Sequence, residues 1–193
     1  MILVGITGGI GSGKSTVCKV LNVLGYPVYH ADERAKFLMS ASRGIIKGLK
    51  EHFGEIIFDD KGQLDRKKLA AIIFHEPTDL KFINSLVHPQ VAEDLVQWAG
   101  QQSSDLLFIE AAILIESGFT KYTHKILVVT APLETRIKRI TNRDQCSLED
   151  AMVRINNQME DKQRIVYADK VITCDGKTLI LPQLFTFINS LKK

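Results

Sequence analysis

A glycine-rich stretch near the start of the chain holds the residues whose chemistry is plainest. It reads GGIGSGKST over residues 8–16 and follows a short apolar run. The spacing of Gly8, Gly13, Lys14 and Ser15 is that of a phosphate-binding loop between a strand and a helix. Glycines let successive backbone N–H groups turn toward an anion, and the start of the following helix adds further donors. We therefore predict that this stretch binds a nucleoside triphosphate.

Each part of this loop has an expected role. Lys14 reaches the β and γ phosphates, and the Ser15 hydroxyl joins the coordination shell of Mg²⁺. The expected nucleotide-binding positions are Gly11, Ser12, Gly13, Lys14, Ser15 and Thr16. A turn that only joins a strand to a helix is the alternative, but it needs neither a lysine nor so many glycines. A nucleoside triphosphate and Mg²⁺ are the predicted ligands.

Two carboxylates stand where phosphoryl transfer needs them. Transfer requires an acidic side chain that takes or orients the proton of the acceptor hydroxyl. Asp32 follows a short second apolar run, so it is expected at the carboxyl edge of a sheet, where ligands gather. The alternative is that Asp32 caps the helix that follows. Glu110 ends a third apolar run, where it either contacts Mg²⁺ or substrate, or pairs with a nearby cation.

Positive charge recurs farther along the chain. Arg136, Arg139 and Arg143 lie at i, i+3 and i+7, so they share one face of a predicted helix. Arginines that close over a triphosphate neutralise charge and exclude water, which competes as an acceptor. A solvated helix face with ion pairs along it is the open alternative. The sequence has no base-reading N-K-x-D segment, which disfavours a GTPase switch.

The elements that position these residues alternate between strand and helix. Short apolar runs predict strands at residues 2–6, 27–29, 106–111, 125–130 and 170–173. We therefore predict an α/β fold of three layers, of the P-loop NTPase type, with a five-stranded parallel sheet. The chain is then one kinase domain, residues 1–193, with a helical substrate-binding insertion at residues 32–105 and a helical lid at residues 132–166.

Helix boundaries are expected at specific residues inside the two helical segments. Asp65 is expected to cap a helix that stops at Pro77, and the next helix is expected to run until Pro89 interrupts it. In the lid, Ser147 followed by Asp150 predicts the start of a second helix.

Composition bounds the class of protein. At 193 residues, 45% hydrophobic and 24% charged, the chain has the make-up of a globular domain without a membrane span. A net charge of +3 is too small to indicate a nucleic-acid surface. The cysteines form no C-x-x-C pair, which argues against a zinc site or a disulfide framework. We expect a soluble, cytoplasmic protein without nucleic-acid or membrane partners.

Taken together, these features resemble the dephospho-coenzyme A kinase family. The stretches that carry the resemblance are ITGGIGSGKST at 6–16, AD at 31–32, DRKKL at 65–69, LVHP at 86–89, LIESG at 114–118, ETR at 134–136, QM at 158–159 and AD at 168–169. They cover nearly the whole chain, and the H-P and Q-M pairs are more specific than the loop. The resemblance implies transfer of the γ phosphate of ATP to the ribose 3′-hydroxyl of dephospho-coenzyme A, the final step of coenzyme A biosynthesis.

The same resemblance implies roles for individual residues. Asp32 would act as the base. Lys14 and Arg139 would stabilise the transferring phosphoryl group, and Arg143 would lie near ATP in the lid. The implied acceptor-binding residues are Thr7, Asp32, Arg66, His88 and Glu110. A histidine beside a proline is otherwise more often a structural hydrogen-bonding group.

The chain departs from the family pattern at two places. The family usually reads D-A-D where this chain has HAD at residues 30–32, so the first carboxylate is missing and the base is kept. At the third strand the family usually reads D-x-P-L-L-F-E, and here residues 110–116 read EAAILIE. Two alternatives stay open: a kinase for a nucleoside monophosphate or a sugar, and a regulatory nucleotide-binding protein. The oligomeric state stays open as well.

Overall fold

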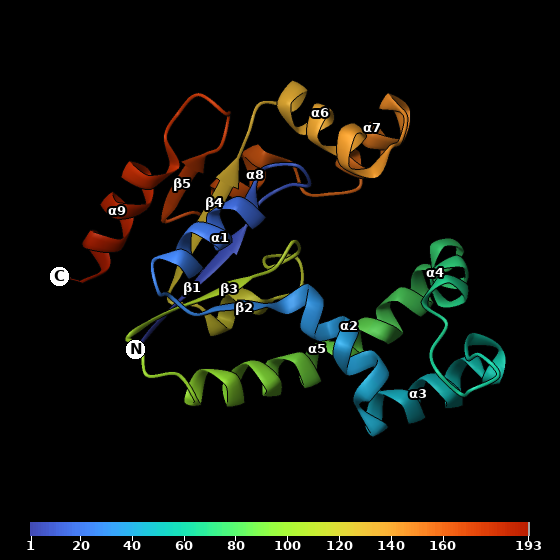
Figure 1. The fold of residues 1–193 in the computed structure, drawn as a ribbon. Coiled ribbons are helices and arrows are strands. Elements are labelled where there is room, and N and C mark those ends of the chain that lie inside the picture. Colours follow the sequence, from blue (N-terminus) through green and yellow to red (C-terminus); the bar gives the residue numbers. More distant parts are fainter. Residues whose placement is uncertain (193) are drawn as a thin grey trace. The chain divides into compact units, whose positions relative to one another are not determined.

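The computed structural model describes residues 1–192, which fall into two compact units. The first unit joins Met1–Tyr29 to Gln102–Lys193 and contains the sheet (Figure 1). The second unit, His30–Gln101, is helical. Its limits lie close to those of the predicted insertion, residues 32–105, whose acceptor-binding role stays a prediction.

Five strands form one parallel sheet, as predicted. They are β1 (Ile2–Thr7), β2 (Val28–His30), β3 (Leu106–Glu110), β4 (Lys125–Thr130) and β5 (Lys170–Thr173). Their order is β2-β3-β1-β4-β5, and β1 pairs in parallel with both β3 and β4. The chain therefore passes first to one side of β1 and then to the other. The carboxyl end of β1 lies at this change of direction, where open α/β sheets bind ligands.

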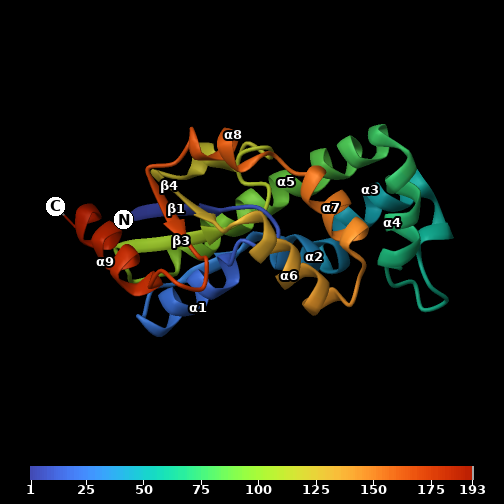
Figure 2. The same ribbon diagram turned by 90° about the horizontal axis from the view of Figure 1, so that it is seen from above.

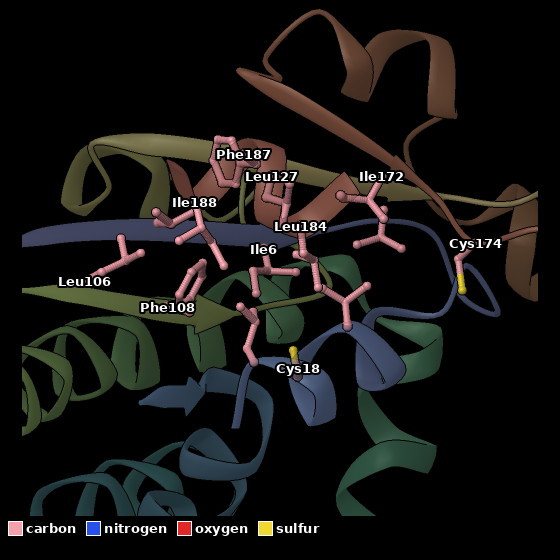
Figure 3. Close-up of a cluster of buried hydrophobic side chains, with 14 residues drawn as sticks. Ile6, Cys18, Leu106, Phe108, Leu127, Ile172, Cys174, Leu184, Phe187 and Ile188 are labelled. Atoms are coloured by element: carbon pink, nitrogen blue, oxygen red, sulfur yellow. The ribbon is translucent and has the colours of Figure 1, made fainter. Parts of the chain in front are cut away.

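One face of the sheet carries a continuous apolar core. The cluster consists of Val4, Ile6, Val17, Cys18, Leu21, Leu106, Phe108, Leu127, Val129, Ile172, Cys174, Leu184, Phe187 and Ile188 (Figure 3). Its strand members are spaced two apart, as the alternation of side chains along a strand requires. Its helical members come from α1 (Lys14–Val23) and α9 (Ile180–Leu191), which cover this face. Burial of the cluster fixes the start of α1 next to the end of β1.

The other face of the sheet is covered within the first unit by a turn segment and a short helix. Leu114 is fully buried, and a Cβ at Gly5 of β1 would lie 2.5 Å from its Cδ2 atom, so the turn packs directly on the strand. Helix α8 (Asp161–Ile165) lies on the opposite side of the sheet from α1 (Figure 2). Helices on both faces confirm the predicted three layers.

The segment predicted as a lid, residues 132–166, forms α6 (Leu133–Asp144), α7 (Leu148–Asn156) and α8, the short helix that covers the sheet. Ser147 is the N-cap residue of α7, as predicted. The Ser147 hydroxyl accepts a hydrogen bond from the Asp150 N–H at 3.0 Å, and the Asp150 carboxylate accepts one from the Ser147 N–H at 3.4 Å. This reciprocal pair satisfies two N–H groups at the start of the helix and separates α7 from α6.

The second unit is built from consecutive helices. They are α2 (Ala31–Ala41), α3 (Arg43–Phe53), a short 3₁₀ turn (Glu55–Ile57), α4 (Arg66–His75) and α5 (Pro77–Gly100). Asp65 caps α4, as predicted, and its carboxylate accepts from the N–H groups of Lys67 and Lys68 at 3.0 and 3.2 Å. Arg34 of α2 donates from Nε to Asp94 of α5 at 2.8 Å, which joins the first and last helices of the unit.

The prediction that a helix ends at Pro89 is wrong. Helix α5 continues through Pro89 over 24 residues. The side chains buried at every fourth position along it are Ile83, Val87, Val91 and Leu95. Packing of this continuous apolar stripe outweighs the backbone hydrogen bond that a proline removes. Long as α5 is, no helix within residues 1–192 combines the length and apolar character needed to cross a membrane.

Candidate active site

The phosphate-binding loop joins β1 to α1 at the carboxyl edge of the sheet. Helix α1 begins at Lys14, and Gly13 is its N-cap residue. The first N–H groups of a helix lack acceptors within it, so this end offers donors and partial positive charge to an anion. Gly11 has a φ of 77°, and a Cβ there would lie 2.7 Å from the backbone oxygen of Arg136. Both conformation and space therefore require glycine at this position.

Lys14 folds back across the loop. Its Nζ atom donates to the carbonyl oxygen of Gly8 at 2.8 Å and lies 3.5 Å from that of Gly9. The ammonium group thus stands beside the loop rather than extending into solvent. A polyphosphate that enters the loop meets this positive charge at once.

Hydroxyl groups follow one another along the loop. The Ser12 side chain is fully buried, and its Oγ atom has no hydrogen-bond partner among the described residues. Ser15 and Thr16, in the first turn of α1, are exposed. A buried hydroxyl without a partner and an exposed one at a helix start suit a polyphosphate with a bound cation. The loop residues therefore fit ATP and Mg²⁺.

Glu110 lies on the strand next to the loop. It is the last residue of β3 and stands in register with Ile6, just before the loop begins. Burial raises the pKa of the Cys18 thiol to about 12, the charge of Glu110 adds to the rise, and Lys14 opposes it. Glu110 and Lys14 therefore both lie close enough to act on this side chain of α1, and the thiol stays protonated at neutral pH.

Thr7 holds the turn after β3 against the end of β1. It is fully buried, and its Oγ1 donates to the carbonyl oxygen of Ala112 at 3.3 Å. The N–H of Ala111 donates to the Ile6 carbonyl at 3.1 Å. Ala112 stands where the family pattern has proline. These two hydrogen bonds therefore position the turn in which this chain differs from the family pattern.

Two arginines of α6 turn toward the backbone of the loop. Arg136 is 6% exposed, and its Nε donates to the carbonyl oxygen of Ile10 at 2.9 Å. Arg139 donates from Nη1 to the Gly11 carbonyl at 3.1 Å and from Nη2 to the Cys174 carbonyl at 2.8 Å. The face shared by these arginines is therefore partly buried against the loop, in contrast to a fully solvated face.

Arg143 lies in an exposed ion-pair cluster at the end of α6. Its Nε contacts Asp144 at 2.7 Å, and Arg154 of α7 contacts the other oxygen of that carboxylate at 2.7 Å. The hydrogen bond that Arg143 donates to the Asp144 carboxylate raises the pKa of its guanidinium, which is charged at any working pH. Asp144 thus holds two arginines of the lid side by side, with one carboxylate against two guanidinium groups.

Asp32 lies in the second unit, in the first turn of α2. The helix starts at Ala31, and its N-cap residue is His30. The alternative that Asp32 caps this helix is therefore wrong. Asp32 is exposed in this first turn, and its role as the base stays a prediction.

Arg66 lies beside a cavity of the second unit. Its Nη2 atom donates to the Lys36 carbonyl at 2.8 Å and to the Ser40 hydroxyl at 3.0 Å, so it links the start of α4 to α2. The cavity has a volume of about 660 Å³ and is lined by residues that include Ser40, Ile46, Phe58, Asp59, Leu64 and Arg66. Polar side chains such as Asp59 and Arg66 line it together with apolar ones such as Ile46 and Phe58, so a ligand there meets both kinds of group.

His88 lies within α5, directly before Pro89. Its side chain is partly buried, and burial lowers the pKa of the imidazole below its usual value of 6.5. The neutral form therefore predominates at pH 7. A neutral imidazole both donates and accepts a hydrogen bond, which suits either a structural role or contact with a polar acceptor.

Several residues behind the loop were not singled out from the sequence as functional. Gln158 accepts a hydrogen bond from the Ile10 N–H through Oε1 at 2.7 Å. Asp161 pairs with Arg136 at 3.1 Å and with Arg164 at 2.8 Å. The Q-M pair of the family pattern was the one signal pointing to this region. It gives no indication of what Gln158 contacts.

The comparisons with known proteins agree with this geometry. The family model described as dephospho-CoA kinase matches residues 2–179. The chain belongs to the dephospho-CoA kinase family. A dephospho-CoA kinase from Bacteroides fragilis is 41% identical over 188 residues, covering 97% of this chain and 91% of the relative.

Solved structures give the same result. TT1252 from Thermus thermophilus superposes with a TM-score of 0.89 at 33% identity, over 100% of this chain and 98% of that one. The dephospho-CoA kinase from Campylobacter jejuni gives a TM-score of 0.67 at 26% identity, over 98% and 95% of the two chains. Membership of the family confirms the predicted fold and assigns to the chain a phosphotransferase activity, the phosphorylation of dephospho-CoA in the final step of CoA biosynthesis.

Proposed function

We propose that the chain transfers the γ-phosphoryl group of ATP directly to the ribose 3′-hydroxyl of dephospho-coenzyme A. The observation that carries this proposal is the loop at the end of β1, where Lys14 crosses the backbone and α1 begins. Backbone donors, a helix start and a flexible cation together bind a triphosphate tail. The family supplies the acceptor, and the loop geometry supports ATP as the donor.

Different residues in and around the loop contact different parts of the nucleotide. Lys14 releases the loop carbonyls and moves to the β and γ phosphates, where it neutralises the charge that grows during transfer. Arg139, held at the loop by the Gly11 and Cys174 carbonyls, adds positive charge on the side of α6. Arg143 contributes from the lid. Mg²⁺, when bound, screens the phosphate oxygens, and the Ser15 hydroxyl would be its ligand from the protein.

Acceptor binding is assigned to the second unit. Asp32 accepts the proton of the 3′-hydroxyl, or orients it, from the first turn of α2. The cavity beside Arg66 is reached along the same helix, since Ser40 lies two turns beyond Asp32, about 12 Å at the rise of an α-helix. A ligand that reacts at Asp32 and extends to this cavity is elongated, as dephospho-coenzyme A is. Arg66 then contacts its polar groups, and His88 stays a second proposed contact.

Transfer is proposed to be direct, without a covalent enzyme intermediate. Cys18 lies next to the loop but is buried, and its thiol, with a pKa of about 12, is protonated at neutral pH. A protonated thiol is not a nucleophile. The acceptor hydroxyl, held by Asp32, therefore attacks the γ phosphorus in line with the leaving ADP.

The test is acceptor-dependent release of ADP by the purified chain with MgATP. Dephospho-coenzyme A is compared with adenosine monophosphate, a hexose and a reaction without acceptor, and ³¹P NMR locates the new phosphate. We expect ADP release only with dephospho-coenzyme A and a new phosphomonoester at the 3′ position. Faster turnover with another acceptor, or release that no acceptor changes, would contradict the proposal. The cytoplasmic location stays a prediction.

A further inference from the structure

The tip of the phosphate-binding loop is held by side chains from distant parts of the chain. The N–H of Ile10 donates to Oε1 of Gln158 at 2.7 Å, and the carbonyl oxygen of Ile10 accepts from Nε of Arg136 at 2.9 Å. Both backbone groups of one loop residue are thus used by partners 148 and 126 residues away in sequence. A loop outside a helix or strand has no regular ladder to fix it, so such partners determine its shape.

Arg136 is itself held in place from behind. Its Nη1 pairs with Asp161 at 3.1 Å, and Asp161 also pairs with Arg164 at 2.8 Å. Arg164 is fully buried, and Glu116 lies 3.8 Å from its Nη2 atom. A buried guanidinium is costly unless carboxylates offset its charge, so this row of alternating charges resists rearrangement. The row fixes the direction in which Arg136 points.

The loop backbone is pressed closely against Arg136. A Cβ at Gly9 would lie 2.2 Å from Nη2 of Arg136, and one at Gly11 would lie 2.7 Å from its backbone oxygen. No larger residue fits at either position without displacing the arginine. The glycines therefore let the loop pack against Arg136 on its outer side, in addition to leaving backbone N–H groups open to phosphate on its inner side.

Gln158 stands at a fixed point between two helices. It follows α7, and its own N–H donates to the Ile155 carbonyl at 3.2 Å. The next helix, α8, begins three residues later at Asp161. The N–H of its N-cap residue, Glu160, donates to Oε1 of Gln163 at 3.4 Å. The Gln158 side chain thus projects from a short turn with both ends anchored, which suits a positioning role.

We propose that Gln158 and Arg136 are positioning residues that hold Ile10, and with it the phosphate-binding loop, in its anion-binding shape before nucleotide arrives. Neither side chain needs to touch ATP. Their hydrogen bonds keep the Ile10 peptide turned outward, so the N–H groups that follow it stay directed at the phosphates. Gln158, which follows the lid helix α7, joins that helix to the loop. The nucleotide site is therefore formed jointly by the N-terminal and C-terminal segments of the first unit.

The test is the variant Gln158→Leu, which keeps the size of the side chain and removes the acceptor. The matched control is Gln163→Leu, a glutamine on α8 whose side chain caps only its own helix. We expect Gln158→Leu to weaken MgADP binding by about tenfold, equal to about 1.4 kcal/mol, as loss of one hydrogen bond in a positioning contact would. The KM for dephospho-coenzyme A should change less than about twofold, and the control should bind MgADP normally.

Two further measurements separate positioning from a general loss of stability. The melting temperature of Gln158→Leu without nucleotide should stay within about 4 °C of the wild type. The proposal would be overturned if MgADP affinity fell and the KM for dephospho-coenzyme A rose by the same factor. Unchanged MgADP affinity would overturn it as well. If the variant does not fold, hydrogen exchange in the wild type decides: the Ile10 amide should be protected without nucleotide, and rapid exchange there would refute the hydrogen bond to Gln158.

Discussion

The phosphate-binding loop of the first unit and the proposed acceptor region of the second unit are built in different ways. At the loop, the buried Arg136 and the half-buried Gln158 hydrogen-bond to the backbone, and the backbone N–H groups in turn are left to bind the ligand. In the second unit, Arg66 of α4 and the cavity beside it present side chains, from helices and from the segment 58–65 before α4. The nucleotide site therefore depends on backbone shape, whereas the acceptor site depends on a few side-chain groups.

This difference has a consequence for specificity. Backbone N–H groups recognise phosphate in any nucleotide, so the loop alone is shared by many enzymes. Side chains on helix surfaces can be exchanged without disturbing the fold, so the second unit can be tuned to one acceptor. The largest effects of mutation are expected at the loop and the smallest in the interior of the second unit.

Lys14→Ala should have the largest effect, because it removes the positive charge that we propose contacts both the bound and the transferring phosphates. We expect kcat/KM for ATP to fall by about 10³-fold, with losses in both binding and chemistry. Lys19→Ala, an exposed lysine of the same helix, is the control. Steady-state kinetics with varied ATP measures the effect. A fall in kcat/KM of less than about tenfold would show that the loop backbone binds the phosphates of ATP without this lysine.

Asp32→Asn should have the next largest effect and a different character. The amide keeps the shape of the side chain but cannot take a proton, so kcat should fall by about 10²-fold or more while MgATP affinity stays nearly intact. Glu33→Gln, the adjacent exposed acid on α2, is the control. Unimpaired turnover in Asp32→Asn would remove Asp32 from the role of base.

Arg66→Ala tests the acceptor half of the comparison. We expect the KM for dephospho-coenzyme A to rise by about tenfold, because a charged hydrogen-bond donor is lost from the rim of the cavity. The KM for ATP should be unchanged. Lys68→Ala, an exposed lysine on the same helix, should leave both constants as they are. A matching rise in the KM for ATP would contradict the assignment of Arg66 to the acceptor.

His88 should give the smallest effect, seen in stability rather than in turnover. Burial lowers its pKa below 6.5, so the unfolded chain binds this proton more readily than the folded chain. Stability contributed at this site is therefore present above pH 6.5 and is lost as the pH falls below it. His88→Gln should flatten the fall in melting temperature between pH 7 and pH 5.5, roughly the range in which histidine titrates. An unchanged slope would show that His88 does not titrate on unfolding.

The strands and the loop were predictable because their signals are local. A parallel strand buried on both faces reads as an apolar run, and the loop needs glycines at fixed positions. The caps at Asp65 and Ser147 were found for the same reason, since each cap bonds residues within one turn. Such signals need no knowledge of the rest of the fold.

The wrong and missing predictions have the opposite cause. At Pro89 the local signal for a helix end was overridden by a buried stripe that continues on both sides of the proline. The contact between Ile10 and Gln158 joins residues 148 positions apart, and periodicity alone does not show which face of α6 is buried. Asp32 belongs to the same class, because its place inside α2 depends on where the preceding strand ends.

The most direct test of the account is a pair of binding measurements on two variants. Isothermal titration calorimetry gives the Kd of MgADP and of dephospho-coenzyme A for Lys14→Ala and Arg66→Ala. The account predicts that Lys14→Ala loses affinity for MgADP and keeps it for dephospho-coenzyme A, and that Arg66→Ala does the reverse. If either variant lost both affinities equally, the division between a backbone-built nucleotide site and a side-chain-built acceptor site would be contradicted.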